Sequence, residues 1–282
     1  MITPFTDDGE VDHQTAWRLA RHLTEQGTDT LVIAGTTGES PTLSDDEKVA
    51  LFHTVVDAVG EKETKVVAGT GTNDTRHSVE LTERAAEAGV DGVLAVTPYY
   101  NKPTQEGLVA HFTAIADVGL PVMLYNIPGR TSQRIEIETL ARLDSHPNVV
   151  AVKDAMMDLE FTSDTINRIP NLPVYSGQDS LTLPMISVGA VGVVSVISHL
   201  AGRALKSMIE AAHSGDWEEA RRLHHLLLPL CHACFLETSP SPVKAAVSAF
   251  WEPVGRPLLP LVEASSETLA AIEKALGAVH SL

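Results

Sequence analysis

The feature that most constrains the fold is a regular alternation of short apolar runs with amphipathic stretches along most of the chain. Eight runs have the length and composition of strands: residues 1–5, 30–35, 65–70, 92–98, 121–126, 149–155, 173–177 and 192–198. Helical patterns cover residues 13–26, 45–59, 74–88, 105–117 and 159–168. Repeated strand–helix units form either an open doubly wound sheet or a closed barrel. Eight units in about 215 residues favour an α/β fold of the (β/α)8 TIM barrel type, which typically needs roughly 250 residues.

The last part of the chain contains no strand-like run and predicts a helical region of its own. Its three helical patterns cover residues 216–236, 242–251 and 265–276. We therefore expect a barrel catalytic domain over residues 1–215 and a C-terminal three-helix region over residues 216–282.

Charge and hydropathy argue against several classes of partner. The 282 residues include 20 Lys and Arg against 37 Asp and Glu, a formal net charge of −17. This charge argues against binding to nucleic acid or to an anionic membrane. The first residues lack a basic region followed by an apolar stretch, and no apolar run approaches the roughly 20 residues of a membrane span. We expect a cytoplasmic protein in which an anionic substrate meets local positive charge.

The two cysteines, Cys231 and Cys234, have the CxxC spacing of metal and redox sites. This interpretation is weak, because no second pair of ligands follows at a suitable spacing and the segment is apolar and helical. Two buried thiols are the better interpretation, with His224 and His225 on a helix surface. No metal and no cofactor are expected.

Lys153 is the residue that points most directly to chemistry. The run VVAVKDA (149–155) predicts a strand buried on both faces, where an unpaired ammonium group is costly. Removal from water favours the neutral amine, which can attack a carbonyl group and form a Schiff base. The alternative is a strand-end lysine whose ammonium reaches solvent.

The residues that follow the other predicted strands favour the reactive lysine. In barrels of parallel strands, the chemistry lies at the C-terminal ends of the strands. Here those ends carry GTTGES (35–40), TPYYNKP (97–103), YNIPGRT (125–131) and SGQD (176–179), in addition to Lys153. We therefore expect hydroxyl groups, one arginine and the lysine at a single mouth of the barrel.

The segments GTTGES, TPYYNKPTQEG, YNIPGRT and VAVKDA, in this order, resemble the dihydrodipicolinate synthase family over nearly the whole chain. GTTGE and the lysine strand are shared with the wider superfamily of pyruvate-dependent Schiff-base aldolases, whereas the arginine of YNIPGRT is more discriminating. Family members have several more residues before the TPF segment. This difference leaves two interpretations, a truncated first strand or a misassigned start.

The resemblance implies a set of residues that form an imine with pyruvate. Lys153 would attack the ketone, and the backbone donors of Thr36 and Thr37, with the Thr37 hydroxyl, would hold the carboxylate. Gly177 and Val194 would line the pyruvate pocket.

The resemblance also implies a proton relay and a second carboxylate site. Tyr125, Thr36 and Tyr100 would transfer protons, and Arg130 would bind the carboxylate of aspartate semialdehyde through a bidentate pair of hydrogen bonds. The residue types alone leave other interpretations open: the tyrosines could be rim aromatics, and Thr36 and Thr37 could cap the following helix.

The expected function is the condensation of pyruvate with L-aspartate 4-semialdehyde to 4-hydroxy-tetrahydrodipicolinate, on the diaminopimelate route to lysine. The alternatives are a retro-aldol lyase acting on a 2-keto-3-deoxy sugar acid and a non-catalytic keto-acid binding protein. The resemblance further implies a homo-oligomer, a tetramer built as a dimer of dimers, in which Tyr100 reaches the active site of a neighbouring subunit.

Feedback-inhibited members of the family bind lysine in a pocket that this sequence matches only in part. Ser40, Asn73 and Tyr99 match the pocket, but Lys48 stands where such enzymes have a histidine and His77 where they have a glutamate. Both differences oppose the binding of an additional ammonium group. We expect an enzyme that is insensitive to lysine.

Overall fold

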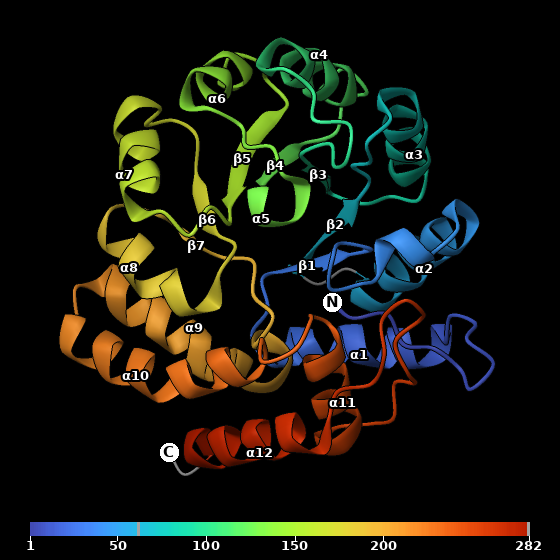
Figure 1. Cartoon of the computed structure of the whole chain (residues 1–282), viewed down its shortest axis with the longest axis vertical. Coiled ribbons are helices and arrows are strands. Elements are labelled where there is room, and N and C mark those ends of the chain that lie inside the picture. The colour runs from blue at the N-terminus through green and yellow to red at the C-terminus, as the bar shows by residue number, and fades with distance from the viewer. Residues whose placement is uncertain (61–62, 281–282) are drawn as a thin grey trace. The chain divides into compact units, whose positions relative to one another are not determined.

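The computed structural model describes residues 1–60 and 63–280 (Figure 1). These residues form two compact units. Unit 1 comprises Met1–Val66 and Val196–Leu282, and unit 2 comprises Val67–Ser195. The boundary near residue 215 that the sequence suggests separates the part of the chain with strand patterns from the part without them. The two units are instead defined by which residues lie close together in space. That domain division stays a prediction.

Unit 2 contains parallel strands that pair side by side in chain order. The strands are β2 (Lys65–Gly69), which begins in unit 1, β3 (Gly92–Val96), β4 (Val122–Asn126), β5 (Val149–Asp154), β6 (Val174–Ser176) and β7 (Gly192–Val193). The helices between them are α3 (Thr75–Glu87), α4 (Gln105–Ala116), α5 (Pro128–Thr131), α6 (Ile137–Asp144), α7 (Leu159–Arg168) and α8 (Thr182–Ser187). In Figure 1, α3, α4, α6 and α7 follow one another along the outside of these strands.

The core of unit 2 forms where helices such as α4 present an apolar stripe to buried strands. On α4, Leu108, Phe112 and Ile115 recur at helical spacing and are fully buried. On the strands, Val93 and Leu124 are fully buried as well. Buried parallel strands of this kind have nearly continuous apolar sequences, so they could be predicted from the sequence.

Besides the first residues of β2, the described part of unit 1 contains one further strand and the C-terminal helices. Its elements are α1 (His13–Glu25), β1 (Thr30–Ile33), α2 (Asp45–Val59), α9 (Ser198–Ser214), α10 (Trp217–Ala233), α11 (Ser241–Phe250) and α12 (Ser266–His280). Helix α10 packs against α9 and α12 (Figure 1). The three helical patterns after residue 216 are confirmed, whereas α5, α6, α8 and α9 are helices that the sequence analysis did not predict.

The first predicted strand, residues 1–5, is wrong for the described chain. Phe5 forms only an isolated antiparallel bridge with Val11. The terminal ammonium group of Met1 donates to the Val32 carbonyl at 2.6 Å, and the Ile2 N–H donates to Nε2 of His199 at 3.0 Å. The segment is apolar because it is buried, and residues 1–5 belong to none of the described strands.

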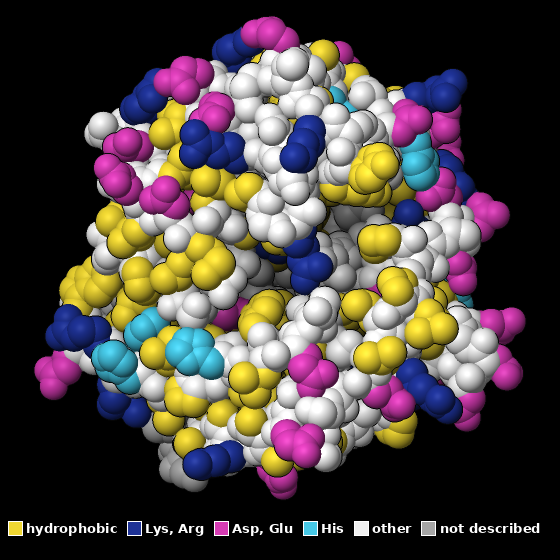
Figure 2. Space-filling view, viewed as in Figure 1, with side chains coloured by type: hydrophobic (Ala, Val, Ile, Leu, Met, Phe, Trp, Pro, Cys, Tyr) yellow, Lys and Arg dark blue, Asp and Glu magenta, His cyan; other side chains and the backbone are white. Residues whose placement is uncertain are grey.

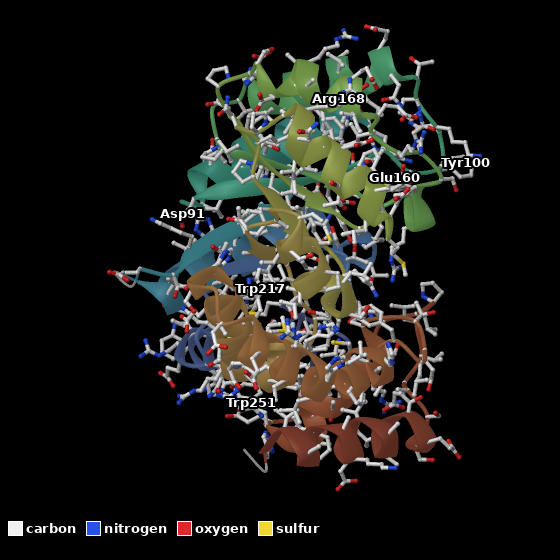
Figure 3. The ribbon with its side chains drawn as sticks, turned by 90° about the vertical axis from the view of Figure 1, so that its left-hand side faces the viewer. Asp91, Tyr100, Glu160, Arg168, Trp217 and Trp251 are labelled. Carbon is white, nitrogen blue, oxygen red and sulfur yellow. The ribbon has the colours of Figure 1, made fainter. Side chains whose placement is uncertain are left out.

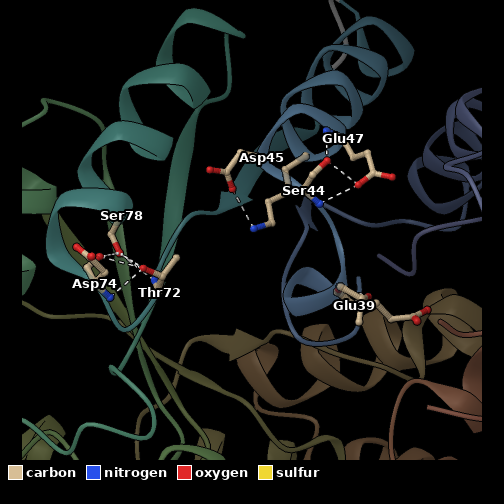
Figure 4. A network of polar contacts seen from close by, with 9 residues as sticks. Glu39, Ser44, Asp45, Glu47, Thr72, Asp74 and Ser78 are labelled. Carbon is tan, nitrogen blue, oxygen red and sulfur yellow. Dashed lines mark hydrogen bonds and ion pairs between the residues drawn. The ribbon is translucent and has the colours of Figure 1, made fainter. Parts of the chain in front are cut away.

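A capping box begins α2 and settles which residue caps this helix. The Ser44 hydroxyl accepts a hydrogen bond from the Glu47 N–H at 3.3 Å, and the Ser44 N–H donates to Oε2 of Glu47 at 2.7 Å (Figure 4). Thr36 and Thr37 are therefore not the helix caps. Their side chains remain available for another role.

Charged side chains are spread over the surface. The face in Figure 2 shows Asp and Glu side chains scattered among Lys and Arg. Exposed ion pairs such as Arg168–Glu138 at 2.7 Å link neighbouring helices, and pairs of this kind contribute little to stability. Within the described residues, no helix combines the length and apolar character needed to cross a membrane. The cytoplasmic location stays a prediction.

Candidate active site

Two neighbouring strands of unit 2 place a lysine beside a tyrosine. Lys153 on β5 and Tyr125 on β4 are register partners, each one residue before the end of its strand. The Lys153 Nζ lies 4.0 Å from the centroid of the Tyr125 ring. Tyr125 is buried, with 4% of its surface exposed, and Lys153 is half-buried. An aromatic ring attracts an ammonium group that lies over its face.

The strand that carries Lys153 is less buried than the sequence predicts. Val150 is 43% exposed, and the register between β4 and β5 shifts opposite it, between Val122 and Met123. Val150 is thus an extra residue on β5 relative to β4, and a bulge of this kind disrupts the alternation of side chains along the strand. The prediction of a strand buried on both faces is wrong at Val150, and Lys153 is half-buried rather than enclosed. Lys153 therefore keeps part of its surface in contact with solvent.

Gly177, just after β6, is packed closely against the lysine. Its N–H donates to the Asp154 carbonyl at 2.7 Å. A Cβ atom at this position would lie 3.1 Å from Cε of Lys153 and 2.8 Å from Cβ of Ala155. A glycine is required here by space rather than by backbone angles. The structure brings Gly177 and Lys153 together, and a role in pyruvate binding stays a prediction.

The next two strands add residues to this end of unit 2. Val194 follows β7, is half-buried, and donates its N–H to the Ser176 carbonyl at 2.8 Å. Tyr175 on β6 is the other register partner of Lys153, and its ring packs against Gly192. The sequence analysis did not single out Tyr175, although its place near the end of a predicted strand was a usable signal.

The last residues of β4, β5 and β6 are polar and buried. Asn126, Asp154 and Ser176 are register partners on β4, β5 and β6, and all three are buried. Asp154 accepts hydrogen bonds from the Thr162 hydroxyl at 2.6 Å and from the Met156 N–H at 2.8 Å. Burial raises the pKa of Asp154, while these two hydrogen bonds act to lower it. The bond to Thr162 ties the end of β5 to α7.

Arg130 lies on the short helix α5, in a loop that is closed by paired hydrogen bonds. The Asn126 amide donates to the Ile135 carbonyl at 3.1 Å, and the Ile135 N–H donates to Oδ1 of Asn126 at 3.0 Å. The Thr131 hydroxyl also donates to the Ile127 carbonyl at 3.1 Å. Arg130 itself is exposed. The loop holds a solvent-accessible cation immediately after the strand of Tyr125.

Tyr100 projects from the loop after β3, at the edge of its unit (Figure 3). It is 91% exposed and has a φ of +73°. Asn101, the next residue, donates its side-chain amide to the Asn73 carbonyl at 2.8 Å and anchors the loop. A tyrosine exposed to this degree makes little contact with its own chain.

Thr36 and Thr37 belong to unit 1, in the turn that follows β1. The Gly38 N–H donates to the Gly35 carbonyl at 3.0 Å, and the Glu39 N–H donates to the Thr36 carbonyl at 3.2 Å. Within the described part of the chain, the N–H groups of Thr36 and Thr37 donate to no other group. Both residues are half-buried, so each keeps a donor for a ligand.

The CxxC segment has no metal-site geometry. Cys231 and Cys234 are buried, which confirms the interpretation as buried thiols. His224 is half-buried and His225 is exposed. Across residues 1–60 and 63–280, no group of three or more His, Cys, Asp or Glu side chains is placed to hold a metal ion.

Parallel strands that pair in chain order and alternate with helices, with a lysine and a tyrosine at adjacent strand ends, define an α/β protein whose candidate site lies at the ends of its strands. The comparisons with known proteins give its family. Residues 1–279 match the model of the Dihydrodipicolinate synthetase family. The chain belongs to this family.

Individual relatives agree over nearly the full length. A 4-hydroxy-tetrahydrodipicolinate synthase from Synechococcus elongatus is 53% identical over 98% of this chain and 93% of its own length. The crystal structure of the synthase from Cyanidioschyzon merolae with lysine bound is 44% identical, with a TM-score of 0.96 over 100% of this chain and 97% of that one. The chloride-inhibited synthase from Acinetobacter baumannii complexed with pyruvate is 36% identical, with a TM-score of 0.95 over 100% of this chain and 97% of that one.

These likenesses establish the class and the reaction. The chain has the α/β barrel fold with C-terminal helices, and it is a lyase with 4-hydroxy-tetrahydrodipicolinate synthase activity in lysine biosynthesis. The sequence-based predictions of fold class, enzyme class and reaction are confirmed.

Proposed function

We propose that Lys153 performs this reaction by forming an imine with pyruvate. The observation that carries the proposal is the stacking of Lys153 Nζ on the Tyr125 ring, at 4.0 Å from its centroid, beside the close approach of Gly177. The neutral amine adds to the ketone carbon, and loss of the oxygen as water gives the imine. Tyr125 supplies and removes the protons for these steps, together with Thr36 and Tyr100.

The imine then acts as an electron sink for carbon–carbon bond formation. Loss of a methyl proton gives an enamine, whose carbon attacks the aldehyde carbon of L-aspartate 4-semialdehyde, and the resulting alkoxide is protonated. The amino group of that substrate next attacks the imine carbon and closes the ring. The bond to Lys153 breaks, and the lysine leaves as the free amine.

Two separate groups of donors hold the two carboxylates. The N–H groups of Thr36 and Thr37, with the Thr37 hydroxyl, bind the carboxylate of pyruvate, supported by the lack of other acceptors for these N–H groups in the described chain. Arg130 binds the carboxylate of the semialdehyde, supported by its exposed position on the closed loop after β4. Gly177 and Val194 line the pyruvate side.

A substrate panel tests this assignment. The purified protein is incubated with pyruvate and either L-aspartate 4-semialdehyde or the aldehyde products of sugar-acid cleavage, and the reverse cleavage of 2-keto-3-deoxy sugar acids is assayed in parallel. We expect turnover with the semialdehyde at a specificity constant well above that of any sugar acid. Faster cleavage of a sugar acid would favour the retro-aldol lyase instead. Binding of pyruvate without turnover of any substrate would favour a keto-acid binding protein.

We also propose a homo-oligomer, a dimer of dimers, in which Tyr100 acts in the active site of a second copy. The 91% exposure of Tyr100 supports this role, because the side chain makes little contact with its own chain. Mixing inactive Tyr100→Phe and Lys153→Ala proteins and exchanging subunits should restore activity. Hybrids that form, as seen by native mass spectrometry, and stay inactive would exclude action in trans.

A further inference from the structure

Unit 1 contains a buried ion pair that the proposed chemistry does not use. Lys244 on α11 and Glu39 in the turn after β1 lie 205 residues apart in sequence, and their side chains are each 1% exposed. The Lys244 Nζ donates to Oε1 of Glu39 at 2.7 Å. Glu39 lies at the turn that precedes α2 (Figure 4). An ion pair this deeply buried gains little net stability over apolar residues of the same size, so its presence calls for another purpose.

The groups around the pair complete its polar contacts. The other carboxylate oxygen of Glu39 accepts a hydrogen bond from the Leu258 N–H at 2.8 Å. The Lys244 Nζ also lies 3.9 Å from the centroid of the Phe5 ring. Burial lowers the pKa of Lys244 to about 8, and the Glu39 carboxylate opposes this shift. The Glu39 side chain is thus fixed by the C-terminal segment from both of its oxygens.

The turn that Glu39 ends has a backbone that needs such fixing. Ala34 and Glu39, which flank the two threonines, have φ values of +50° and +57°, unusual for residues with a side chain. Gly38 lies between Thr37 and Glu39, and its carbonyl accepts a hydrogen bond from the Thr3 hydroxyl at 2.7 Å. A strained turn persists only where its surroundings hold it. The contacts of this turn with the C-terminal segment are made by the Glu39 carboxylate, which accepts hydrogen bonds from Lys244 and Leu258.

We propose that Lys244 is a positioning residue, which acts through Glu39 to aim the N–H groups of Thr36 and Thr37 at the carboxylate of pyruvate. The C-terminal helices then contribute to substrate binding without touching the substrate. This inference rests on the proposed role of the two threonines. Misplacement of binding groups by about 1 Å can cost as much as a hundredfold in rate.

The test compares four variants by steady-state kinetics with each substrate varied in turn. Lys244→Met removes the charge and keeps most of the length of the side chain, Lys244→Arg restores the charge, and Thr37→Val reports the contribution of the carboxylate site itself. Lys206→Met is the matched control, because Lys206 in the same unit pairs with Asp29 at 2.7 Å on the surface. We expect Lys244→Met and Thr37→Val to raise the KM for pyruvate by about tenfold or more while the KM for the semialdehyde stays near wild type. Lys244→Arg should recover part of the loss, and Lys206→Met should change neither KM.

A purely structural role predicts a different result. Loss of folded protein lowers the apparent kcat and leaves both KM values unchanged, so a wild-type KM for pyruvate in Lys244→Met would overturn the inference. Should Lys244→Met fail to fold, Glu39→Gln replaces it as the deciding variant under the same criteria. If Thr37→Val also keeps the wild-type KM for pyruvate, the proposed carboxylate site is wrong. If the Lys244 and Glu39 variants keep the wild-type KM for pyruvate while Thr37→Val raises it, the proposed carboxylate site is supported and the positioning role of Lys244 is wrong.

Discussion

The two units of this enzyme use a lysine in opposite ways. In unit 2, Lys153 is half-buried, lies on the Tyr125 ring, and forms no ion pair among the described residues. In unit 1, Lys244 is fully enclosed, and a carboxylate and an aromatic ring surround its ammonium group. The Lys244 amine is enclosed and hydrogen-bonded to a carboxylate, so a carbonyl compound from solvent does not reach it. Lys153 is half-buried on an aromatic ring, and no carboxylate of the described residues holds its nitrogen.

If Lys153 is the reactive amine, as we propose, burial alone does not identify a reactive lysine. Lys48 on α2 is a third example, since it is 5% exposed and its Nζ lies 3.3 Å from Oδ1 of Asp45. The more completely buried lysines are the paired ones. What distinguishes Lys153 is the kind of neighbour it has, a tyrosine and a glycine in place of a carboxylate.

The tyrosine beside Lys153 should be essential for its chemistry. Tyr125→Phe keeps the ring under the lysine and removes only the hydroxyl, so kcat should fall by about 10² to 10⁴, the usual contribution of a positioned acid or base. Tyr175→Phe is the matched control, because Tyr175 is the other register partner of Lys153 and has no assigned role. Stopped-flow and steady-state assays measure both. Equal losses in the two variants would remove the distinction between the neighbours of Lys153.

Substitution of Lys244 should lower the stability of the protein more than substitution of Lys153 does. Lys244→Met leaves the buried Glu39 carboxylate without its cation, and removing one partner of a buried pair costs about 3 to 5 kcal/mol in the free energy of unfolding. Lys153→Ala removes a half-buried side chain and should cost within about 1 kcal/mol. Thermal and urea unfolding compare the two proteins directly. A greater loss of stability in Lys153→Ala would break the comparison.

Arg130 should affect only the second substrate. Arg130→Ala should leave imine formation with pyruvate near wild type and lower kcat/KM for the semialdehyde by about tenfold or more, since hydrogen bonds to charged groups contribute roughly 1.5 to 3 kcal/mol. Arg134→Ala is the control, because Arg134 is also exposed and pairs with Glu136 at 2.8 Å. An unchanged kcat/KM in Arg130→Ala would mean that the second carboxylate binds elsewhere.

Added lysine should have the smallest effect. The cation of Lys48 and the histidine at position 77 oppose a cationic ligand, although Asp45 beside Lys48 restores part of the negative charge. We expect the rate at saturating pyruvate to stay unchanged in 1 mM L-lysine. Inhibition below about 1 mM, a binding free energy near −4.1 kcal/mol, would contradict this. The double variant Lys48→His with His77→Glu should become more sensitive to lysine than the wild type.

Local patterns in the sequence predicted most of the fold, because buried parallel strands and amphipathic helices each have a characteristic period. The same reasoning failed for residues 1–5, whose apolar character reflects burial without strand pairing. It also failed at Val150, since a register shift between two strands depends on the partner strand.

The site could be predicted in part for a similar reason. Lys153 and Tyr125 end predicted strands, so a local pattern located them. The pairing of Lys244 with Glu39 joins residues 205 apart in sequence, and no local period connects them. The sequence therefore presented Lys244 as one residue of an ordinary helix, and only the three-dimensional structure gave it a partner.

The most direct test of the central claim is to trap the imine. The protein is treated with borohydride in the presence of pyruvate, digested with trypsin, and analysed by mass spectrometry, with Lys153→Ala and Lys244→Met treated in parallel. We predict one reduced pyruvate adduct on the peptide that contains Lys153, formed by the wild type and, at sufficient pyruvate, by Lys244→Met, and absent from Lys153→Ala. An adduct on a different lysine, or full activity in Lys153→Ala, would contradict the assignment of Lys153 as the reactive amine.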